Sequence, residues 1–239
     1  MPRIIYPGIS INQKEVKITS AELIKYIRNV LRLKPGEVLE LLDGRGTIYS
    51  GTIRSVSKAA IEISISDQRK ERQQGTALVL IQPLLKGDKM DLVVQKCTEL
   101  GVTEIYPVTT ERTIPRTTRK LHHWRRVAEE ATRQSGRTIV PEIHEVTDLR
   151  ELLPRFSGMD CVKIVFYEHA TALLRSISYD RMPEKILYLT GPEGGFTDRE
   201  IKEAEAAGFR VVSLGGGILR AETASIVSLA LIKYHFGLM

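Results

Sequence analysis

The chain has 239 residues, of which 42% are hydrophobic and 27% charged, and its formal net charge is +6. This length and composition suit one large or two small soluble globular domains, and the modest positive charge permits a polyanionic partner. Because its two cysteines, Cys97 and Cys161, are far apart, a disulfide scaffold or a zinc site is not expected. Neither a bilayer-spanning apolar run nor a signal-peptide core is found, so we expect a cytoplasmic protein without membrane attachment.

The first seventy residues alternate between short apolar runs and turns. Ser20 is placed to cap a helix that ends near Leu31. The run 38–42 leads into Asp43-Gly44, a strong turn signal, and residues 61–65 alternate apolar and polar side chains as a half-buried strand does. Several short strands with tight turns predict a small β-barrel over residues 1–68. The polar stretch 67–75 is interpreted as a linker, followed by a second domain at 76–239.

Basic side chains gather in two places. In the predicted barrel, either ordinary solvated surface or a phosphate-contacting face accounts for them: Arg3, Lys25, Arg28, Arg32, Lys34, Arg45 and Arg54. Residues 112–137 hold eight arginines and lysines against two glutamates, a surplus of +6. A polar helix face explains those between 119 and 133 equally well, but Arg112, Arg116 and Arg137 favour contact with anions.

The second domain begins with an alternation of strands and helices. A buried strand at 77–81 ends at Pro83, and a helix then runs from about Asp88 until Gly101 closes it. The strand at 104–108 follows, which implies a parallel pair with a right-handed crossover. Runs at 161–166 and 185–189 fit further parallel strands, so this domain is predicted to be α/β.

The last fifty residues contain two glycine-rich loops. Residues 190–195 (TGPEGG) and 214–220 (LGGGILR) each follow a short apolar run. Because glycine lacks a Cβ, backbone at these loops can turn sharply and approach a ligand closely. At the ends of adjacent strands, two such loops would form one crevice, which is where open α/β sheets bind ligands. We therefore hypothesise a cofactor site there.

Simpler explanations exist for part of this pattern. Thr197 and Glu200 form a capping box, so Gly194 and Gly195 could serve only as entry to a helix. Three consecutive glycines at 215–217 exceed what a plain turn needs. The final helix, at about 221–236, is apolar on most sides, which predicts packing on its own sheet and on a second subunit in a homodimer. No metal site is expected, because the histidines lack a ligand spacing.

Several motifs in order resemble the RsmE family of ribosomal small-subunit RNA methyltransferases, which modify uridine at N3 and belong to the SPOUT superfamily. The resemblance covers nearly the whole chain. It rests on residues 189–197, 214–215 and 218–224, on 86–91, 95–102, 110–113 and 130–137 upstream, and on 30–33, 36 and 43–46 in the first domain. It implies a C-terminal parallel-sheet α/β domain with a trefoil knot, preceded by a PUA-like barrel that binds RNA.

The resemblance also implies S-adenosylmethionine as cofactor, small-subunit (16S) ribosomal RNA as substrate and no catalytic metal. The expected cofactor-binding residues are Thr190, Gly191, Pro192, Gly195, Leu214, Gly215, Leu219, Thr223 and Ala224. The expected RNA-binding residues are Arg3, Arg28, Arg32, Lys86, Arg112, Arg116, Gln134 and Arg137, with Glu111 as a further candidate near the site. The family commonly has an arginine where this chain has Gly217.

Two residues are expected to be catalytic. Methylation at N3 requires that the uridine lose a proton, and Arg220 is the first candidate to stabilise the resulting anion. Glu222 is either the orienting partner of Arg220 or a carboxylate favoured by the helix dipole. No general base can be assigned. Two alternative functions stay open: a knotted methyltransferase for another RNA or base, and a non-catalytic RNA-binding factor in ribosome assembly.

Overall fold

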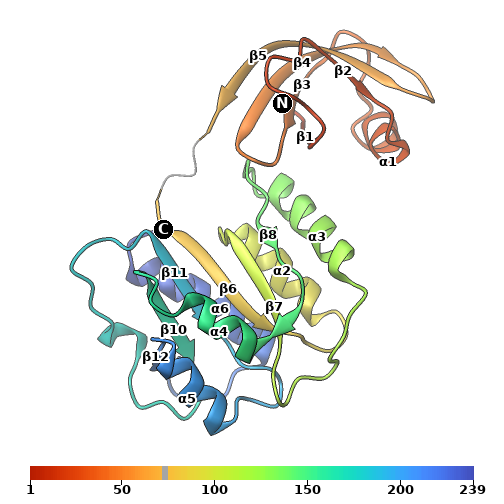
Figure 1. Ribbon diagram of the computed structural model, residues 1–239. Helices are drawn as coiled ribbons and strands as arrows, with labels where there is room; N and C mark the ends of the chain where they lie inside the picture. The colour runs from red at the N-terminus through yellow and green to blue at the C-terminus, as the bar shows by residue number, and fades with distance from the viewer. Residues whose placement is uncertain (72–74) are drawn as a thin grey trace. The chain divides into compact units, whose positions relative to one another are not determined.

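The computed structural model describes residues 1–71 and 75–239, which form two compact units. The barrel unit comprises Met1–Gln73 together with Thr132–Val140, and the α/β unit comprises Gln74–Ala131 and Pro141–Met239 (Figure 1). Residues 132–140, which chain order places inside the predicted second domain, therefore belong to the first unit.

The barrel unit is a curled five-stranded sheet with one helical segment (Figure 1). Its strand order is β1-β3-β4-β5-β2, in which only the β1–β3 pair is parallel. Ile24 and Ile27 of the helical segment are buried in the core against Leu39 and Tyr49 of the sheet. The elements are β1 (Arg3–Ile5), β2 (Glu15–Ile18), α1 (Ala21–Lys25), the π-helical turn η1 (Tyr26–Val30), β3 (Val38–Leu42), β4 (Thr47–Val56) and β5 (Ile61–Lys70).

Two local predictions for this unit are corrected. The helix that Ser20 caps is α-helical only to Lys25 and continues as a π-helical turn. The predicted linker is strand in its first part, because β5 runs to Lys70 and pairs there with Thr47 of β4. Residues 67–70 are exposed, so backbone pairing holds them in the sheet and no apolar alternation marks them. Residues 72–74 of the predicted linker lie outside the described residues.

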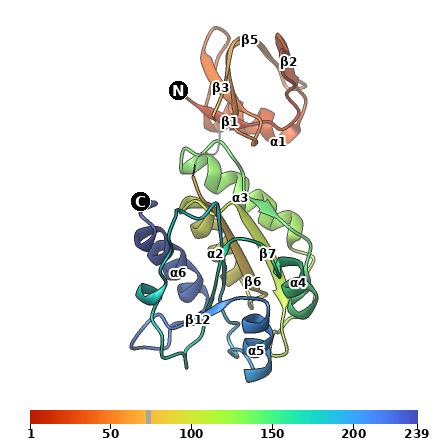
Figure 2. The same cartoon turned by 60° about the vertical axis from the view of Figure 1, so that its left-hand side comes forward.

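The α/β unit is built on a parallel sheet in the order β12-β10-β11-β6-β7-β8, with β9 also paired to β7. Helices cover both faces, α2 and α6 on one and α4 and α5 on the other (Figure 2). The elements are β6 (Ala77–Pro83), α2 (Lys89–Glu99), β7 (Glu104–Thr109), α3 (Leu121–Gln134), β8 (Glu142–Ile143), β9 (Thr147–Asp148), α4 (Leu149–Phe156), β10 (Val162–Phe166), η2 (Leu174–Ser176), β11 (Lys185–Leu189), α5 (Asp198–Ala206), β12 (Arg210–Val212) and α6 (Ala221–His235).

Strand alternation explains the two helical layers. Leu187 and Leu189 of β11 pack in one core cluster with the apolar side chains of α4 and α5. Tyr188, between them, points to the opposite face, where its hydroxyl lies 3.6 Å from the Cys97 sulfur of α2. Because both faces are covered, these strands are almost wholly apolar. The predicted parallel α/β architecture is thus confirmed.

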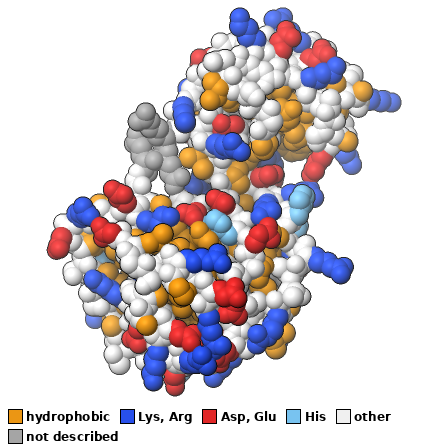
Figure 3. Space-filling view, in the orientation of Figure 1, with side chains coloured by type: hydrophobic (Ala, Val, Ile, Leu, Met, Phe, Trp, Pro, Cys, Tyr) orange, Lys and Arg blue, Asp and Glu red, His pale blue; other side chains and the backbone are white. Residues whose placement is uncertain are grey.

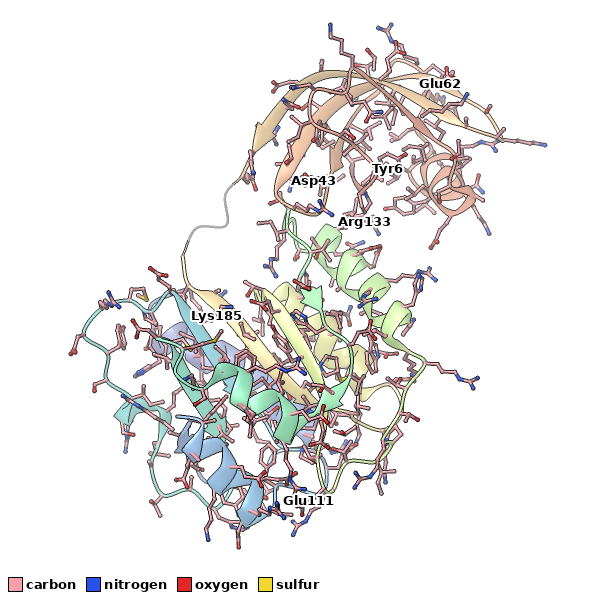
Figure 4. The ribbon with its side chains drawn as sticks, in the orientation of Figure 1. Tyr6, Asp43, Glu62, Glu111, Arg133 and Lys185 are labelled. Carbon is pink, nitrogen blue, oxygen red and sulfur yellow. The ribbon has the colours of Figure 1, made fainter. Side chains whose placement is uncertain are left out.

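The direction of the parallel strands decides at which end of the sheet the candidate ligand-binding loops of this unit lie. Lys185, at the start of β11, and Glu111, just beyond β7, lie at opposite ends of the sheet (Figure 4). The two glycine-rich loops follow β11 and β12 and therefore share the carboxyl end of the sheet with Glu111. Their strands are not adjacent as expected, because β10 lies between them. Over residues 1–71 and 75–239, no helix is both long and apolar enough to cross a membrane.

Candidate functional site

A cavity of about 860 Å³ lies in the α/β unit where the two glycine-rich loops meet. Lys89 at the start of α2 also lines it. Most of the predicted cofactor-binding residues, and the predicted catalytic Arg220, line this cavity: Thr190, Gly191, Pro192, Gly195, Leu214, Gly215, Leu219, Arg220 and Ala224. Thr223 and Glu222 are not among its lining residues. The hypothesis that both loops form one crevice is therefore supported by the geometry, although a third strand separates them.

The first loop serves both the cavity and the helix after it. Gly195 has a φ of +68°, and its amide donates to the Pro192 carbonyl at 2.9 Å. Thr197 and Glu200 then form the predicted capping box of α5. A Cβ on Gly194 would lie 3.0 Å from the Arg112 Cβ, and Arg112 Nη1 donates to the Gly194 carbonyl at 3.1 Å. Arg112, which is expected to contact RNA, thus packs against this loop and is hydrogen-bonded to its backbone.

The second loop turns on Gly215, whose φ is +100°. Its amide donates to the Ser213 hydroxyl at 3.1 Å, and the Gly217 amide donates to the Gly215 carbonyl at 2.8 Å. Arg220 then takes the N-cap position of α6, where its carbonyl accepts from Ala224 at 2.8 Å. A Cβ on Gly217 would meet no atom within 4 Å, so the arginine common at this position in the resembled family would find open space.

Sequence reasoning missed the third wall of the cavity. The loop after β10 contributes Tyr167, Glu168, Ala170 and Leu173. It is joined to the second glycine loop through Ser213, whose amide donates to the Ala172 carbonyl at 2.8 Å. No glycine or motif marks this stretch, and its only signal is its place after an apolar strand.

A buried polar network links the elements behind the cavity. The Ser225 hydroxyl of α6 lies 2.6 Å from Gln82 Oε1 of β6 and 2.9 Å from the Thr190 hydroxyl. Gln82 Nε2 donates to the Pro83 carbonyl at 3.0 Å. All three side chains are fully buried, and such groups are costly unless hydrogen-bonded. The network therefore fixes the start of the first loop against the helix that follows the second.

Charged side chains at the cavity fall into a paired set and an unpaired set. Lys89 Nζ lies 3.0 Å from Glu193 Oε1 and 3.9 Å from Glu222 Oε2. Burial opposes ionisation of Glu193, but the hydrogen bonds from Lys89 and the Lys86 amide outweigh it and lower the pKa of Glu193. Glu222 is only 8% exposed and faces Lys89, so it pairs with Lys89 and not with Arg220 as one interpretation held. The Arg220 side chain is exposed and makes no hydrogen bond or ion pair within the described ranges.

The predicted RNA-binding residues divide between the two units. In the barrel unit, Arg3 is paired with buried Glu40 at 2.8 Å and donates to the Gly136 carbonyl at 2.8 Å, so it holds the fold together. The side chains of Arg28 and Arg32 make no hydrogen bond or ion pair in the part of the chain that is described. Burial lowers the pKa of Arg137.

Of the remaining candidates, Lys86, Arg112 and Arg116 lie in the α/β unit. Arg116 donates to the Glu111 carbonyl at 2.9 Å, and Lys86 is exposed beside the first glycine loop. Figure 3 shows Lys and Arg side chains gathered with acidic ones at the lower end of this unit, the end at which Figure 4 labels Glu111. The exposed Gln134 belongs to the barrel unit.

The cavity suits S-adenosylmethionine on physical grounds. Its volume falls in the range of small-molecule sites, about 300–1,000 Å³. Glycines at 191, 195, 215, 216 and 217 leave backbone without side chains along its wall. Its lining combines apolar groups with charges of both signs, as a zwitterionic nucleoside requires.

Comparisons with known proteins identify the family of the chain. Residues 72–233 match the family described as RNA methyltransferase domain, and residues 18–66 match the RNA methyltransferase PUA domain, which confirms the predicted PUA-like fold. A ribosomal RNA small subunit methyltransferase E from Synechocystis is 31% identical, over 97% of this chain and 77% of the relative. Another, from Buchnera aphidicola subsp. Schizaphis graminum, is 32% identical over 99% of this chain and 97% of the relative.

A solved structure is similar over almost the whole chain. The crystal structure of a ribosomal RNA small subunit methyltransferase E from Neisseria gonorrhoeae, bound to S-adenosyl methionine, has a TM-score of 0.87 and 33% identity. The match covers 98% of this chain and 97% of that one. The chain therefore belongs to the RNA methyltransferase family whose curated members are named ribosomal RNA small subunit methyltransferase E.

Proposed function

We propose that this protein transfers a methyl group from S-adenosylmethionine to the N3 atom of a uridine in small-subunit ribosomal RNA. The observation that carries the proposal is the cavity formed by two glycine-rich loops in a chain of this family. The names of the relatives support the choice of substrate, and a relative was crystallised with the same cofactor.

Backbone groups would hold the cofactor. The glycine-rich stretches around Gly191, Gly195 and Gly215 present peptide groups to the cavity without obstruction by side chains. When bound, S-adenosylmethionine supplies a methyl group on a sulfonium, which is a good leaving group, so the reaction needs no metal. Thr190 and Ser225 keep these loops in register through the buried network around Gln82.

The protein must position the reactants and assist loss of the N3 proton. Holding reacting atoms about 3–3.5 Å apart can supply much of the acceleration. Arg220, whose exposed side chain lines the cavity and has no hydrogen bond or ion pair among the described residues, would stabilise a uridine anion. Glu222 and Lys89 would have a supporting role, because Glu222 Oε2 lies 3.9 Å from Lys89 Nζ in the first turn of α6, which starts at Ala221 directly after Arg220.

The proposed function includes RNA contacts by the barrel unit, a homodimer and a place in the cytoplasm. Arginines of the barrel unit, the partly buried Arg28 and the exposed Arg32, would contact RNA phosphates. A homodimer is supported by α6, on which Leu231 is 38% and Tyr234 77% exposed although the helix is largely apolar. An enzyme that acts on ribosomal RNA would work in the cytoplasm.

Replacement of Arg220 tests the assigned chemistry. Arg220→Ala should reduce methyl transfer at least 100-fold, by analogy with loss of one donor to a developing anion, while cofactor affinity measured by calorimetry changes little. The matched control is Arg175→Ala, an exposed arginine outside the cavity, which should retain full activity. Near-normal turnover by Arg220→Ala would remove Arg220 from the catalytic residues.

A further inference from the structure

Glu168 is a cavity-lining carboxylate with no partner of its own. It lies in the loop after β10 and is exposed. Within residues 1–71 and 75–239, its side chain makes no hydrogen bond or ion pair. Its Oε1 atom would lie only 2.7 Å from a Cβ built on Gly195, so the carboxylate sits directly against the first glycine loop.

The other charges lining the cavity leave Glu168 uncompensated. Glu193 is neutralised by Lys89 at 3.0 Å. Arg220 is on the second glycine loop and forms no ion pair with Glu168. A carboxylate at the wall of a partly enclosed cavity interacts more strongly with a nearby charge than it would in bulk water. The loop after β10 therefore presents an unmatched negative charge to whatever enters.

The absence of a side chain at Gly195 is part of this arrangement. A Cβ built there would lie 2.7 Å from Glu168 Oε1, which is the end of an exposed, flexible side chain; the φ of +68° is what favours glycine at this position, and the close approach shows that the carboxylate lies against the loop. The carboxylate thus lies beside the backbone that would bind a nucleoside cofactor, and it is a candidate for selecting the charge of that cofactor.

We propose that Glu168 is a specificity-determining residue that recognises a positively charged group of S-adenosylmethionine. The inference rests on the proposed function, since it takes this cofactor as the ligand. The cofactor carries two cations, the sulfonium and the α-ammonium, and either can supply the charge. Neutral nucleosides of the same shape gain nothing from Glu168.

Calorimetry with three ligands tests this assignment. S-adenosylmethionine has both cations, S-adenosylhomocysteine has only the ammonium, and methylthioadenosine has neither. Glu168→Gln keeps the size and the acceptor oxygen but removes the charge. The substitution should weaken the binding of S-adenosylmethionine about tenfold, roughly 1.4 kcal/mol. The affinity for methylthioadenosine should stay within about twofold of the wild-type value. Loss of S-adenosylhomocysteine affinity as well would locate the contact at the ammonium, and its retention would locate it at the sulfonium.

Two controls separate charge from structure. Glu205→Gln removes an exposed carboxylate on α5 outside the cavity and should change none of the three affinities. Glu168→Asp should restore part of the discrimination. Equal binding of S-adenosylmethionine by Glu168→Gln and wild type, or equal weakening of methylthioadenosine, would overturn this inference and leave the proposed function intact. Failure of the wild type to bind S-adenosylmethionine would overturn both.

Discussion

The Thr190 hydroxyl lies 2.9 Å from the Ser225 hydroxyl, although the two residues are 35 positions apart and both are fully buried. Thr190 opens the first glycine-rich loop, and Ser225 belongs to α6, which follows the second. Gln82 of β6 completes the contact at 2.6 Å from Ser225. A single buried hydrogen-bond network therefore couples the two loops that form the cavity.

Ser225→Ala should destabilise the α/β unit by about 1–3 kcal/mol, because Gln82 and Thr190 lose a shared buried partner. It should also weaken S-adenosylmethionine binding, since the loops lose their register. Urea unfolding followed by the single tryptophan, Trp124 in α3, measures the first effect. Calorimetry measures the second.

The chain offers a matched control on the same helix. Ser228 is equally buried, but its hydroxyl has no hydrogen-bond partner among the described residues. Ser228→Ala should therefore be neutral or slightly stabilising, because no bond is lost. If both variants lose the same stability, the network around Gln82 is not what holds the loops.

Gly215 and Gly217 should respond differently to the same substitution. A Cβ at either position meets no atom within 4 Å, but Gly215 has a φ of +100°, which side chains rarely adopt. Gly215→Ala should cost about 1–3 kcal/mol of backbone strain and lower cofactor affinity. Gly217→Ala should change stability by less than about 0.5 kcal/mol. Similar effects for the two variants, in unfolding and in calorimetry, would contradict this account of the second loop.

Acid should selectively weaken the barrel unit through Glu40. Burial opposes ionisation of Glu40, but Arg69 and Arg3 outweigh it and lower its pKa below the ordinary value of about 4.5. A pKa lowered by folding stabilises the protein above the unfolded pKa, and this contribution is lost as the pH falls through the folded one. Glu40→Gln should therefore cost about 1–3 kcal/mol at pH 7, and the gap to wild type should close below about pH 4.

Amide hydrogen exchange of β3 and β4 peptides reports on this unit separately from the α/β unit. Glu62→Gln is the control, because the ion pair of Glu62 with Lys17 is long, at 3.7 Å, and exposed. A stability gap between wild type and Glu40→Gln that stays constant from pH 7 to pH 3 would rule out the ionisation of Glu40 as its cause.

RNA affinity should depend steeply on salt, with a log–log slope of about −0.7 for each phosphate contacted on a single strand. Arg32→Gln should lower affinity and reduce that slope by about one such unit, because Arg32 is exposed and unpaired in the described part of the chain. Arg3→Gln should mainly cost stability, since Arg3 is engaged by Glu40 and Gly136. A salt-independent affinity would exclude phosphate contacts as the basis of RNA binding.

Much of the secondary structure could be predicted from the sequence, because apolar periodicity, helix caps and turn residues are local signals. Apolar runs, the capping box at Thr197 and the turn glycines predicted most of the strands and helices, but not the short strands β1, β2, β8 and β9 or the helix α4. Pattern failed at β5, where the exposed polar residues up to Lys70 are held by backbone pairing and by polar contacts such as that of Arg69 with Glu40, which no apolar alternation marks. It also missed the place of β10 between β11 and β12, since strand order in a sheet is decided by tertiary packing.

Some residues of the candidate site could also be predicted from the sequence, and others could not. Gly195 and Gly215 could be found because glycine at a sharp turn leaves a mark in the sequence. Glu168 and Lys89 could not, because a single charged residue after a strand or at a helix start has many possible roles. The partner of Glu222, which is Lys89, depends on a contact across 133 positions of chain that no local pattern encodes.

Position-mapped methyl transfer tests the central claim most directly. Small ribosomal subunits that lack the modification, and free 16S RNA as a second arm, are incubated with the protein and S-adenosylmethionine carrying a labelled methyl group. Mass spectrometry then locates the label in digested RNA. The account predicts label on N3 of a single uridine, with transfer lost in Arg220→Ala. Label on another base, or no transfer by a protein that binds the cofactor, would contradict it.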